Sequence, residues 1–499
     1  MTAARADTTP IPVLLPRAGA GHQFVLYADA CSGVPGAPHE ATFAAVNATV
    51  ARLRPQPEFI CFPGDEIQGL LADDTALRAQ WHHWLAREMS WLDPAIPRYH
   101  ATGNHTTYDA ASEAIFREAL PHLPRNGPPG QEGLAYWTRR GDLLLIVVNT
   151  LWSGGGGEGR VETDWLNRTL AAHADARHKL VMGHHPIFPV NGFAGAYQRE
   201  VAPADGAAFW RILARHGVIA YLCSHMLAFD VQVHAGVLQI LTAGAGTAHL
   251  MPPETEYLHC VQVALDAAGL RYQTLDTAGA IREWLGWPLP EPSPLAWQAL
   301  PQGAAAPALS QPNDSAPGAQ FVSWRFAGIT APAGSGEAQT LLAGWDDGPG
   351  LATLWIGLLG PENRLGVLLS PQPGRSPHLW HGPPLDPDAP FAIEVAIHTG
   401  MGPGGILWRR DERSPWSSHD QRLIVGSRAP LLAAPLGARP RPARPRRSPI
   451  PGTTVAGVVA GGGAAVGIEP GAWHLLCTWR TWRCILDLMR EDACLVYFA

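Results

Sequence analysis

The chain has 499 residues, of which 46% are hydrophobic and 16% are charged, and its net charge is −7 at pH 7. This length is too great for one hydrophobic core and predicts two or three domains. The small net charge provides no general attraction to nucleic acids or anionic membranes, so no nucleic-acid partner is expected. The seven cysteines are odd in number and widely spaced, which argues against a disulfide framework. Because no apolar run is long enough to span a bilayer, we expect a soluble, cytoplasmic protein.

Residues 20–287 predict an α/β domain in which strands alternate with helices. Apolar runs typical of buried strands occupy the segments 24–29, 58–61, 98–102, 179–182 and 218–223. Helices are predicted over the segments 43–53, 73–91, 111–120, 163–174 and 207–216. A hairpin is expected over 133–150, and alternating polar and apolar residues predict antiparallel strands in 231–276. This order is typical of a layered sandwich with sheets inside and helices outside.

The remainder of the chain differs in composition. Residues 288–318 are rich in Pro and Ala and predict a linker. Short apolar runs separated by Gly, Pro and Asp predict a β-sandwich over 319–412. Residues 413–499 hold a basic, proline-rich run and a Gly/Ala/Val tract without a consistent period, which predicts a disordered, low-complexity tail. A nucleic-acid- or membrane-contacting arm and an out-of-frame translation product are alternatives for this tail.

Acidic, amide and imidazole side chains follow the predicted strands of the first domain. Asp29 and Gly64-Asp65 follow the first two strands, and Gly103-Asn104-His105, Gly183-His184 and Ser224-His225 follow the next three. Each motif alone is more often a turn or a core histidine. As an ordered set at strand ends, however, they are expected to meet at one edge of the sheets. These donor types bind Mn²⁺, Fe or Zn²⁺, so the set predicts a metal-dependent hydrolase.

From residue 23 to 276, the order of these motifs resembles the calcineurin-like metallophosphoesterase superfamily, and residues 179–193 resemble its purple-acid-phosphatase-like branch. The resemblance implies a four-layer α/β/β/α sandwich with two metals, in which a metal-bound hydroxide attacks phosphorus in line. It implies that Asp65 bridges the two metals and that His105 lies by the leaving group as acid or charge stabiliser. The implied ligands of one complete site are Asp65, Asn104, His184 and His225.

The sequence departs from the family pattern at two places. It has Asp29-Ala30-Cys31 where the family has Asp-x-His, and Ser224-His225-Met226-Leu227 where the family has Gly-His-x-His. Both missing histidines would serve the same metal, so we predict one complete site and one degenerate site. Cys31 is either a thiolate ligand that favours Zn²⁺ or Fe, or a small buried apolar residue.

The predicted function is hydrolysis of phosphate monoesters or diesters with one or two divalent ions. Asn191, Tyr197 and Arg199 follow the His184 motif and are candidates for binding the substrate phosphate. The lectin-like appearance of the predicted β-sandwich suggests carbohydrate as its ligand. The alternative is a catalytically weak metal-binding scaffold or regulatory protein that acts through the β-sandwich.

Overall fold

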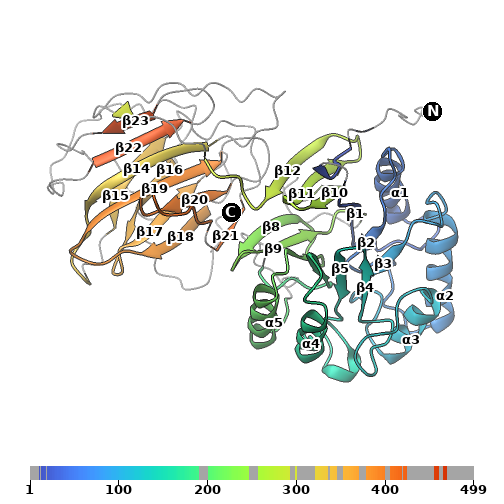
Figure 1. Cartoon of the computed structure of the whole chain (residues 1–499). Helices are drawn as coiled ribbons and strands as arrows, with labels where there is room; N and C mark the ends of the chain where they lie inside the picture. The colour runs from blue at the N-terminus through green and yellow to red at the C-terminus, as the bar shows by residue number, and fades with distance from the viewer. Residues whose placement is uncertain are drawn as a thin grey trace. The chain divides into compact units, whose positions relative to one another are not determined.

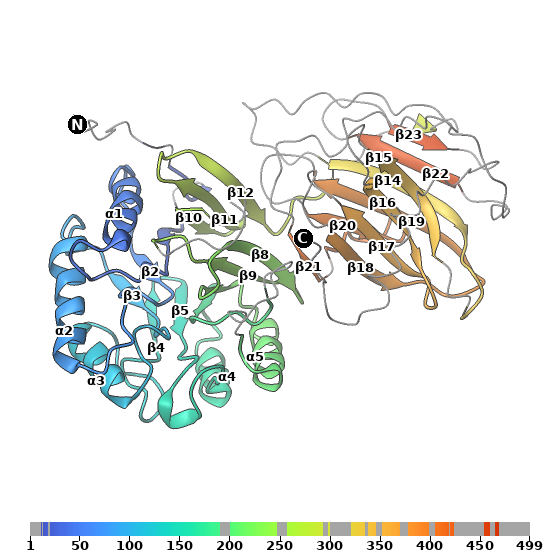
Figure 2. The same cartoon turned by 180° about the vertical axis from the view of Figure 1, so that it is seen from behind.

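The computed structural model describes residues 11, 13–17, 20–189, 200–246, 257–292, 298–299, 321–334, 338–345, 352–369, 378–398, 405–418, 420–423, 454–459 and 465–468. The chain divides into two compact units, residues 1–288 and 289–499 (Figures 1 and 2). In the described part of the chain, no helix is both long and apolar enough to cross a membrane.

The first unit contains a sheet in the order β12-β11-β10-β1-β2-β3. Strands β1, β2 and β3 are parallel to one another, and β10, β11 and β12 join them as antiparallel neighbours. The apolar run of β1 is buried along its whole length, as is usual for strands covered on both faces. The bounds are β1 (His22–Leu26), β2 (Ile60–Phe62), β3 (Arg98–His100), β10 (His259–Asp266), β11 (Gly269–Asp276) and β12 (Ile281–Trp287).

A second sheet of this unit has the order β8-β9-β7-β6-β5-β4. Strands β5, β6, β7 and β9 run parallel, while β4 and β8 pair as antiparallel hairpin partners of β5 and β9. The two sheets are joined by the Tyr136 hydroxyl, which lies 2.9 Å from both the backbone N and the carbonyl O of His100. The bounds are β4 (Tyr136–Arg140), β5 (Leu143–Val147), β6 (His178–Met182), β7 (Ala220–Cys223), β8 (Phe229–His234) and β9 (Val237–Thr242).

Helices cover the outer faces of both sheets (Figure 1). Trp84 packs between Phe43 of α1 and Phe62 of β2, while α4 and α5 share a buried cluster with β5, β6 and β7. The sequence marks where two of these helices begin, because the side chains of Asp73 and Asp109 accept backbone N–H bonds of α2 and α3. The bounds are α1 (Pro38–Ala51), α2 (Asp74–His83), α3 (Ala110–Ala119), α4 (Thr163–Ala172) and α5 (Pro203–Arg215), with a 3-10 turn over Ser153–Gly155. The predicted four-layer α/β/β/α arrangement is confirmed.

One predicted helix differs in detail. The sequence predicts a single helix over 73–91, but α2 ends at His83 and the chain continues as a π-helical turn, η2 (Trp84–Glu88). The large aromatic residues of this segment recur at spacings that suit either helix type, so their pattern does not reveal the change. Trp84, at the start of η2, is fully buried against the first sheet.

The second unit is a β-sandwich. One sheet has the order β13-β22-β14-β19-β20 with β23 paired to β22, and the other has the order β15-β16-β17-β18. Inner residues of both sheets, including Phe326, Ile356, Val367 and Val395, form one buried cluster. The bounds are β13 (Gln298–Ala299), β14 (Phe321–Ile329), β15 (Gln339–Trp345), β16 (Ala352–Leu359), β17 (Arg364–Leu369), β18 (His378–Pro384), β19 (Pro390–His398), β20 (Ile406–Arg409), β21 (Gln421–Arg422), β22 (Thr454–Val459) and β23 (Ala465–Ile468). The predicted all-β sandwich is confirmed.

Strands β22 and β23 of the sandwich lie within the predicted tail, 413–499. Strand β22 pairs with β14 in antiparallel register, and β23 pairs with β22. These segments differ from the expected disordered tail. Their Val and Ala residues can extend the edge of a sheet that is far away in sequence, a pairing that local composition does not reveal. Much of the remaining tail lies outside the described residues.

Candidate metal centre

The candidate ligands follow the carboxyl ends of parallel strands in both sheets. Asp29 and Asp65 each lie three residues beyond the end of β1 or β2, and Asn104 follows β3. His184 and His225 each lie two residues beyond the end of β6 or β7 in the second sheet. The loops after β1 and β2 are tied together, because Cys31 N donates to the Asp65 carbonyl at 2.8 Å. Ligands that are far apart in sequence therefore meet where these strand ends converge.

Two glycines of the motifs are required by close packing. A Cβ at Gly64 would lie 2.7 Å from Nδ1 of His184, and Gly64 has a φ of 107°. A Cβ at Gly103 would lie 2.5 Å from the backbone N of Asp65 and closer still to its carboxylate. Real Cβ atoms essentially never make contacts under 3.0 Å. The glycines therefore let the two polypeptide turns and His184 approach one another.

Several candidate ligands adopt the left-handed backbone conformation. The φ values are 57° for Asp29, 42° for Cys31, 56° for Asp65 and 74° for His225. Non-glycine residues rarely adopt this conformation, and such strain is concentrated at functional sites. Four of the eight positive-φ non-glycine residues in the described part of the chain are therefore candidate ligands.

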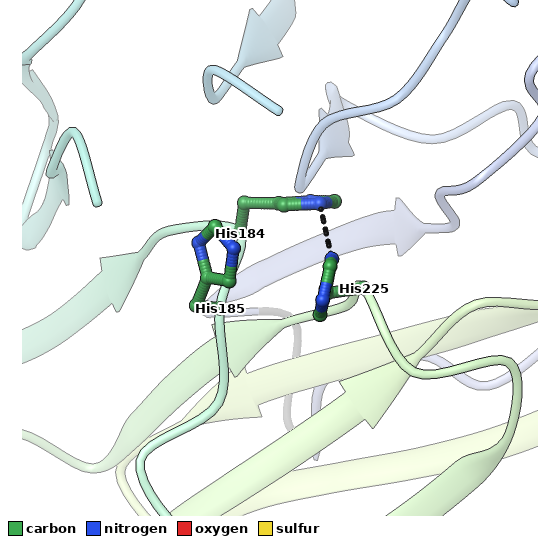
Figure 3. Close-up of side chains that lie close together, drawn as sticks. All are labelled: His184, His185 and His225. Atoms are coloured by element: carbon green, nitrogen blue, oxygen red, sulfur yellow. Dashed lines mark hydrogen bonds between the residues drawn. The ribbon is translucent and has the colours of Figure 1, made fainter. Parts of the chain in front are cut away.

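Donor atoms of Asn104, Asp65 and His225 each lie close to Nε2 of His184. His184 Nε2 lies 2.9 Å from Asn104 Oδ1, 3.3 Å from Asp65 Oδ2 and 3.1 Å from His225 Nδ1. His225 Nδ1 lies 2.8 Å from Asn104 Oδ1. Figure 3 shows His184 and His225 joined by their hydrogen bond, with His185 beside them. Ligands bound at about 2.1 Å around one ion are spaced about 3.0 to 3.4 Å apart, so these separations suit a shared cation.

The hydrogen bonding of His184 fixes which nitrogen is available to a cation. Its Nδ1 lies 2.9 Å from the carbonyl of Pro63 and donates to it, so the Nε2 lone pair is directed at the other three donors. A carbonyl bond to the second ring nitrogen is usual for histidines that bind metal. Lone pairs of Asn104 and His184 would repel one another unless a proton or a cation lay between them. The residues present therefore fit a divalent cation.

Charges within the centre are strongly coupled. Burial alone would lower the pKa of His184, but the neighbouring Asp65 carboxylate raises it to about 9. Burial alone would raise the pKa of Asp65, but His184 and His105 hold it well below its usual range. Burial raises the pKa of Asp29 to about 6, against the lowering effect of His184. The group thus holds a carboxylate beside a proton that a cation would displace.

His185 lies next to the candidate ligands and is held by two other side chains. Its Nδ1 lies 2.8 Å from Thr150 Oγ1, and its Nε2 lies 2.9 Å from Glu158 Oε1. The ring packs on His225 with centroids 4.5 Å apart, and burial lowers the pKa of His185 to about 4. Sequence reasoning did not identify Thr150 or Glu158. The only available signal was the glycine-rich loop that precedes Glu158.

The region of the predicted second site is differently arranged. Asp29 Oδ2 accepts a hydrogen bond from Ser224 Oγ and another, 3.1 Å long, from the backbone N of His225. Leu227 offers only an apolar side chain where the family has its last histidine. One ligand atom each from Cys31, Asp65 and His105 lies within 4.8 Å of the other two. Ser224 was noted only as a departure from the family motif, and its contact with Asp29 had no sequence signal.

The structure thus brings together Asp29, Asp65, Asn104, His184 and His225, with Cys31 and His105 beside Asp65. The three candidates for phosphate binding, Asn191, Tyr197 and Arg199, lie outside the described residues. Carboxylates and imidazoles that gather at the ends of strands from two sheets are typical of metal-dependent hydrolases.

Comparison with known families gives one match. Residues 23–229 match the model of the calcineurin-like phosphoesterase family. The match agrees with the resemblance that the motifs predicted for this part of the chain. A comparison with curated proteins found no match.

The solved structures that are similar to this chain match about half of it. The purple acid phosphatase PPD1 of yellow lupin, Lupinus luteus, is 12% identical with a TM-score of 0.40, and the match covers 55% of each chain. GAP50, the anchor in the inner membrane complex of Plasmodium, is 13% identical with a TM-score of 0.37, covering 54% of this chain and 89% of that one. A putative 5'-nucleotidase of Staphylococcus aureus is 13% identical with a TM-score of 0.33, covering 50% and 51%. At these values the similarity carries no argument about the substrate.

Proposed function

We propose that the first unit hydrolyses phosphate monoesters or diesters with a divalent cation. The cation would be held by Asp65, Asn104, His184 and His225. The observation that carries this proposal is the approach of the other three donor atoms to Nε2 of His184, at 2.9 to 3.3 Å. The match of residues 23–229 to the phosphoesterase family model supports the same class of reaction.

The donor set indicates which cations suit the site. Two imidazoles, one amide oxygen and one carboxylate favour borderline ions such as Mn²⁺, Fe or Zn²⁺ over Ca²⁺. A bound divalent cation activates water and stabilises the charge on phosphoryl oxygens. Asp65 brings the negative charge to the site, since His184 and His105 keep its pKa low.

His105 is the proposed acid or charge stabiliser beside the leaving group. Its backbone N donates to Asp65 Oδ1 at 2.9 Å, which fixes its position next to the cation site. Its ring Nδ1 lies 2.7 Å from the carbonyl of Gln68 and donates to it. This bond leaves Nε2 as the ring atom that reaches the substrate. Asn191, Tyr197 and Arg199 remain candidate substrate contacts on sequence grounds alone.

We further propose that the second metal site is degenerate. Ser224 and His225 both donate to Oδ2 of Asp29, and Leu227 cannot coordinate. This feature also favours the second candidate function, a catalytically weak scaffold that retains one cation. No described residue of the β-sandwich supports carbohydrate over any other ligand, so that suggestion stays a prediction.

Turnover measurements separate the two functions. The full-length protein, freed of metal and then supplied with Mn²⁺, should hydrolyse p-nitrophenyl phosphate or its bis-ester. The variants Asp65→Asn and His105→Ala should lose at least about a hundredfold in kcat/KM. His82→Ala, at an exposed position of α2, is the matched control and should retain full activity. Bound Mn²⁺ without any turnover would favour the scaffold, and equal rates in all variants would refute the assignment.

A further inference from the structure

A second set of donors shares Asp65 with the proposed cation site. Cys31, Asp65 and His105 come from the loops after β1, β2 and β3, and their ligand atoms lie within 4.8 Å of one another. Cys31 and Asp65 are buried, with 4% and 1% exposure, and His105 is half-buried.

Asp29 does not belong to this group. Its Oδ2 atom is held by the hydroxyl of Ser224 and the backbone N of His225, on the side of the second sheet. The ligand that would pair with position 31 in a family-type second site is thus turned towards Ser224. The remaining donors are the thiol of Cys31, the carboxylate of Asp65 and the imidazole of His105.

The tautomer of His105 suits coordination by this group. Its Nδ1 donates to the Gln68 carbonyl at 2.7 Å, the same arrangement that His184 makes with Pro63 at 2.9 Å. Histidines that bind metal usually make this carbonyl bond, which leaves Nε2 with its lone pair. Gly69 allows its loop to lie against the backbone of His105, since a Cβ at position 69 would overlap the His105 carbonyl.

Charge around the thiol also favours a cation. The carboxyl groups of Asp65, Asp29 and Glu66 lie near Cys31. A divalent ion would offset this negative charge and take the thiolate as its ligand, with release of the thiol proton to solvent.

We infer that Cys31, Asp65 and His105 form a second cation site that selects thiophilic divalent ions such as Zn²⁺ or Cd²⁺. The inference rests on the proposed function only in that Asp65 is shared with the first site. A cation at this site would occupy Nε2 of His105, the atom proposed to serve the leaving group. Thiophilic ions should therefore inhibit the turnover that Mn²⁺ supports.

The test uses the full-length, metal-free protein titrated with Cd²⁺ in the presence of Mn²⁺. Wild-type protein should show the ultraviolet thiolate-to-cadmium charge-transfer band, and Cd²⁺ should inhibit hydrolysis of p-nitrophenyl phosphate. Cys31→Ser should lose both the band and the inhibition. Cys260→Ser is the matched control, because Cys260 is also buried and free but lies in β10, and this variant should retain both.

His105→Ala provides an independent variant at a half-buried position. It should retain the band but weaken Cd²⁺ binding at least about tenfold. No band in the wild type, or a band that persists in Cys31→Ser, would overturn the inference, since six other cysteines can bind Cd²⁺. Mn²⁺-supported turnover without the band would leave the proposed function standing alone. A Cys31-dependent band without turnover would refute the proposed function and support the second site.

Discussion

The close approach of Gly103 to Asp65 gives the sharpest test of the proposed centre. In Gly103→Ala, the new Cβ would lie 2.5 Å from the backbone N of Asp65, whereas real contacts essentially never fall under 3.0 Å. The difference between these two distances, 0.5 Å, is the least that the two turns must separate. Since backbone atoms face each other here, no side-chain rotation can relieve the overlap. Overpacking of this kind costs about 1 to 3 kcal/mol of folding free energy.

The same displacement moves the Asp65 carboxylate away from His184, whose Nε2 is 3.3 Å from Asp65 Oδ2. We expect cation affinity to fall at least about tenfold and kcat to fall by up to about a hundredfold. Urea unfolding, calorimetric titration with Mn²⁺ and p-nitrophenyl phosphate turnover measure the three effects. Gly286→Ala is the control, because its Cβ would meet nothing closer than 3.9 Å. If Gly103→Ala matched Gly286→Ala in stability and Mn²⁺ affinity, the proposed centre would be wrong.

Two other predictions concern charge. His184 has a pKa raised to about 9, so its pairing with Asp65 stabilises the cation-free protein fully below about pH 6.5 and this contribution is lost as pH rises through 9. Urea unfolding at pH 7 and pH 10 should show that loss without cation and a smaller loss with Mn²⁺; an equal loss in both would contradict cation binding at His184. In the sandwich, buried Glu394 accepts bonds of 2.6 Å from both Arg325 and Arg409. Glu394→Ala should cost about 3 to 5 kcal/mol in the unfolding of that unit and leave phosphatase turnover unchanged. Unchanged unfolding would show that Glu394 does not hold the two arginines.

The sequence was sufficient to predict the candidate ligands, because each of them directly follows a predicted strand. Asp29, Asp65, Asn104, His184 and His225 each come after an apolar run, and parallel strands bring their carboxyl ends to one edge. The positions of these residues were therefore predictable once the runs were recognised as strands. The layers of the first unit followed from the same alternation of strands and helices.

Other features depend on contacts that local sequence does not encode. The bond between Ser224 and Asp29 joins residues 195 positions apart and needs the two sheets to be placed first. Glu158 reaches His185 from a glycine-rich loop whose course has no periodic signal. The pairing of β22 with β14 joins an apolar tract to an edge more than a hundred residues earlier, so composition alone indicated a tail.

The left-handed backbone at Cys31 and His225 has a consequence for how this protein responds to selection. Only glycine adopts such φ values without steric cost, whereas a side chain there stores about 1 to 3 kcal/mol of strain. A library selected for heat resistance alone would therefore accumulate glycine at both positions. The selected proteins would unfold at a higher temperature, but each substitution would remove a donor atom from the region where the two sheets meet.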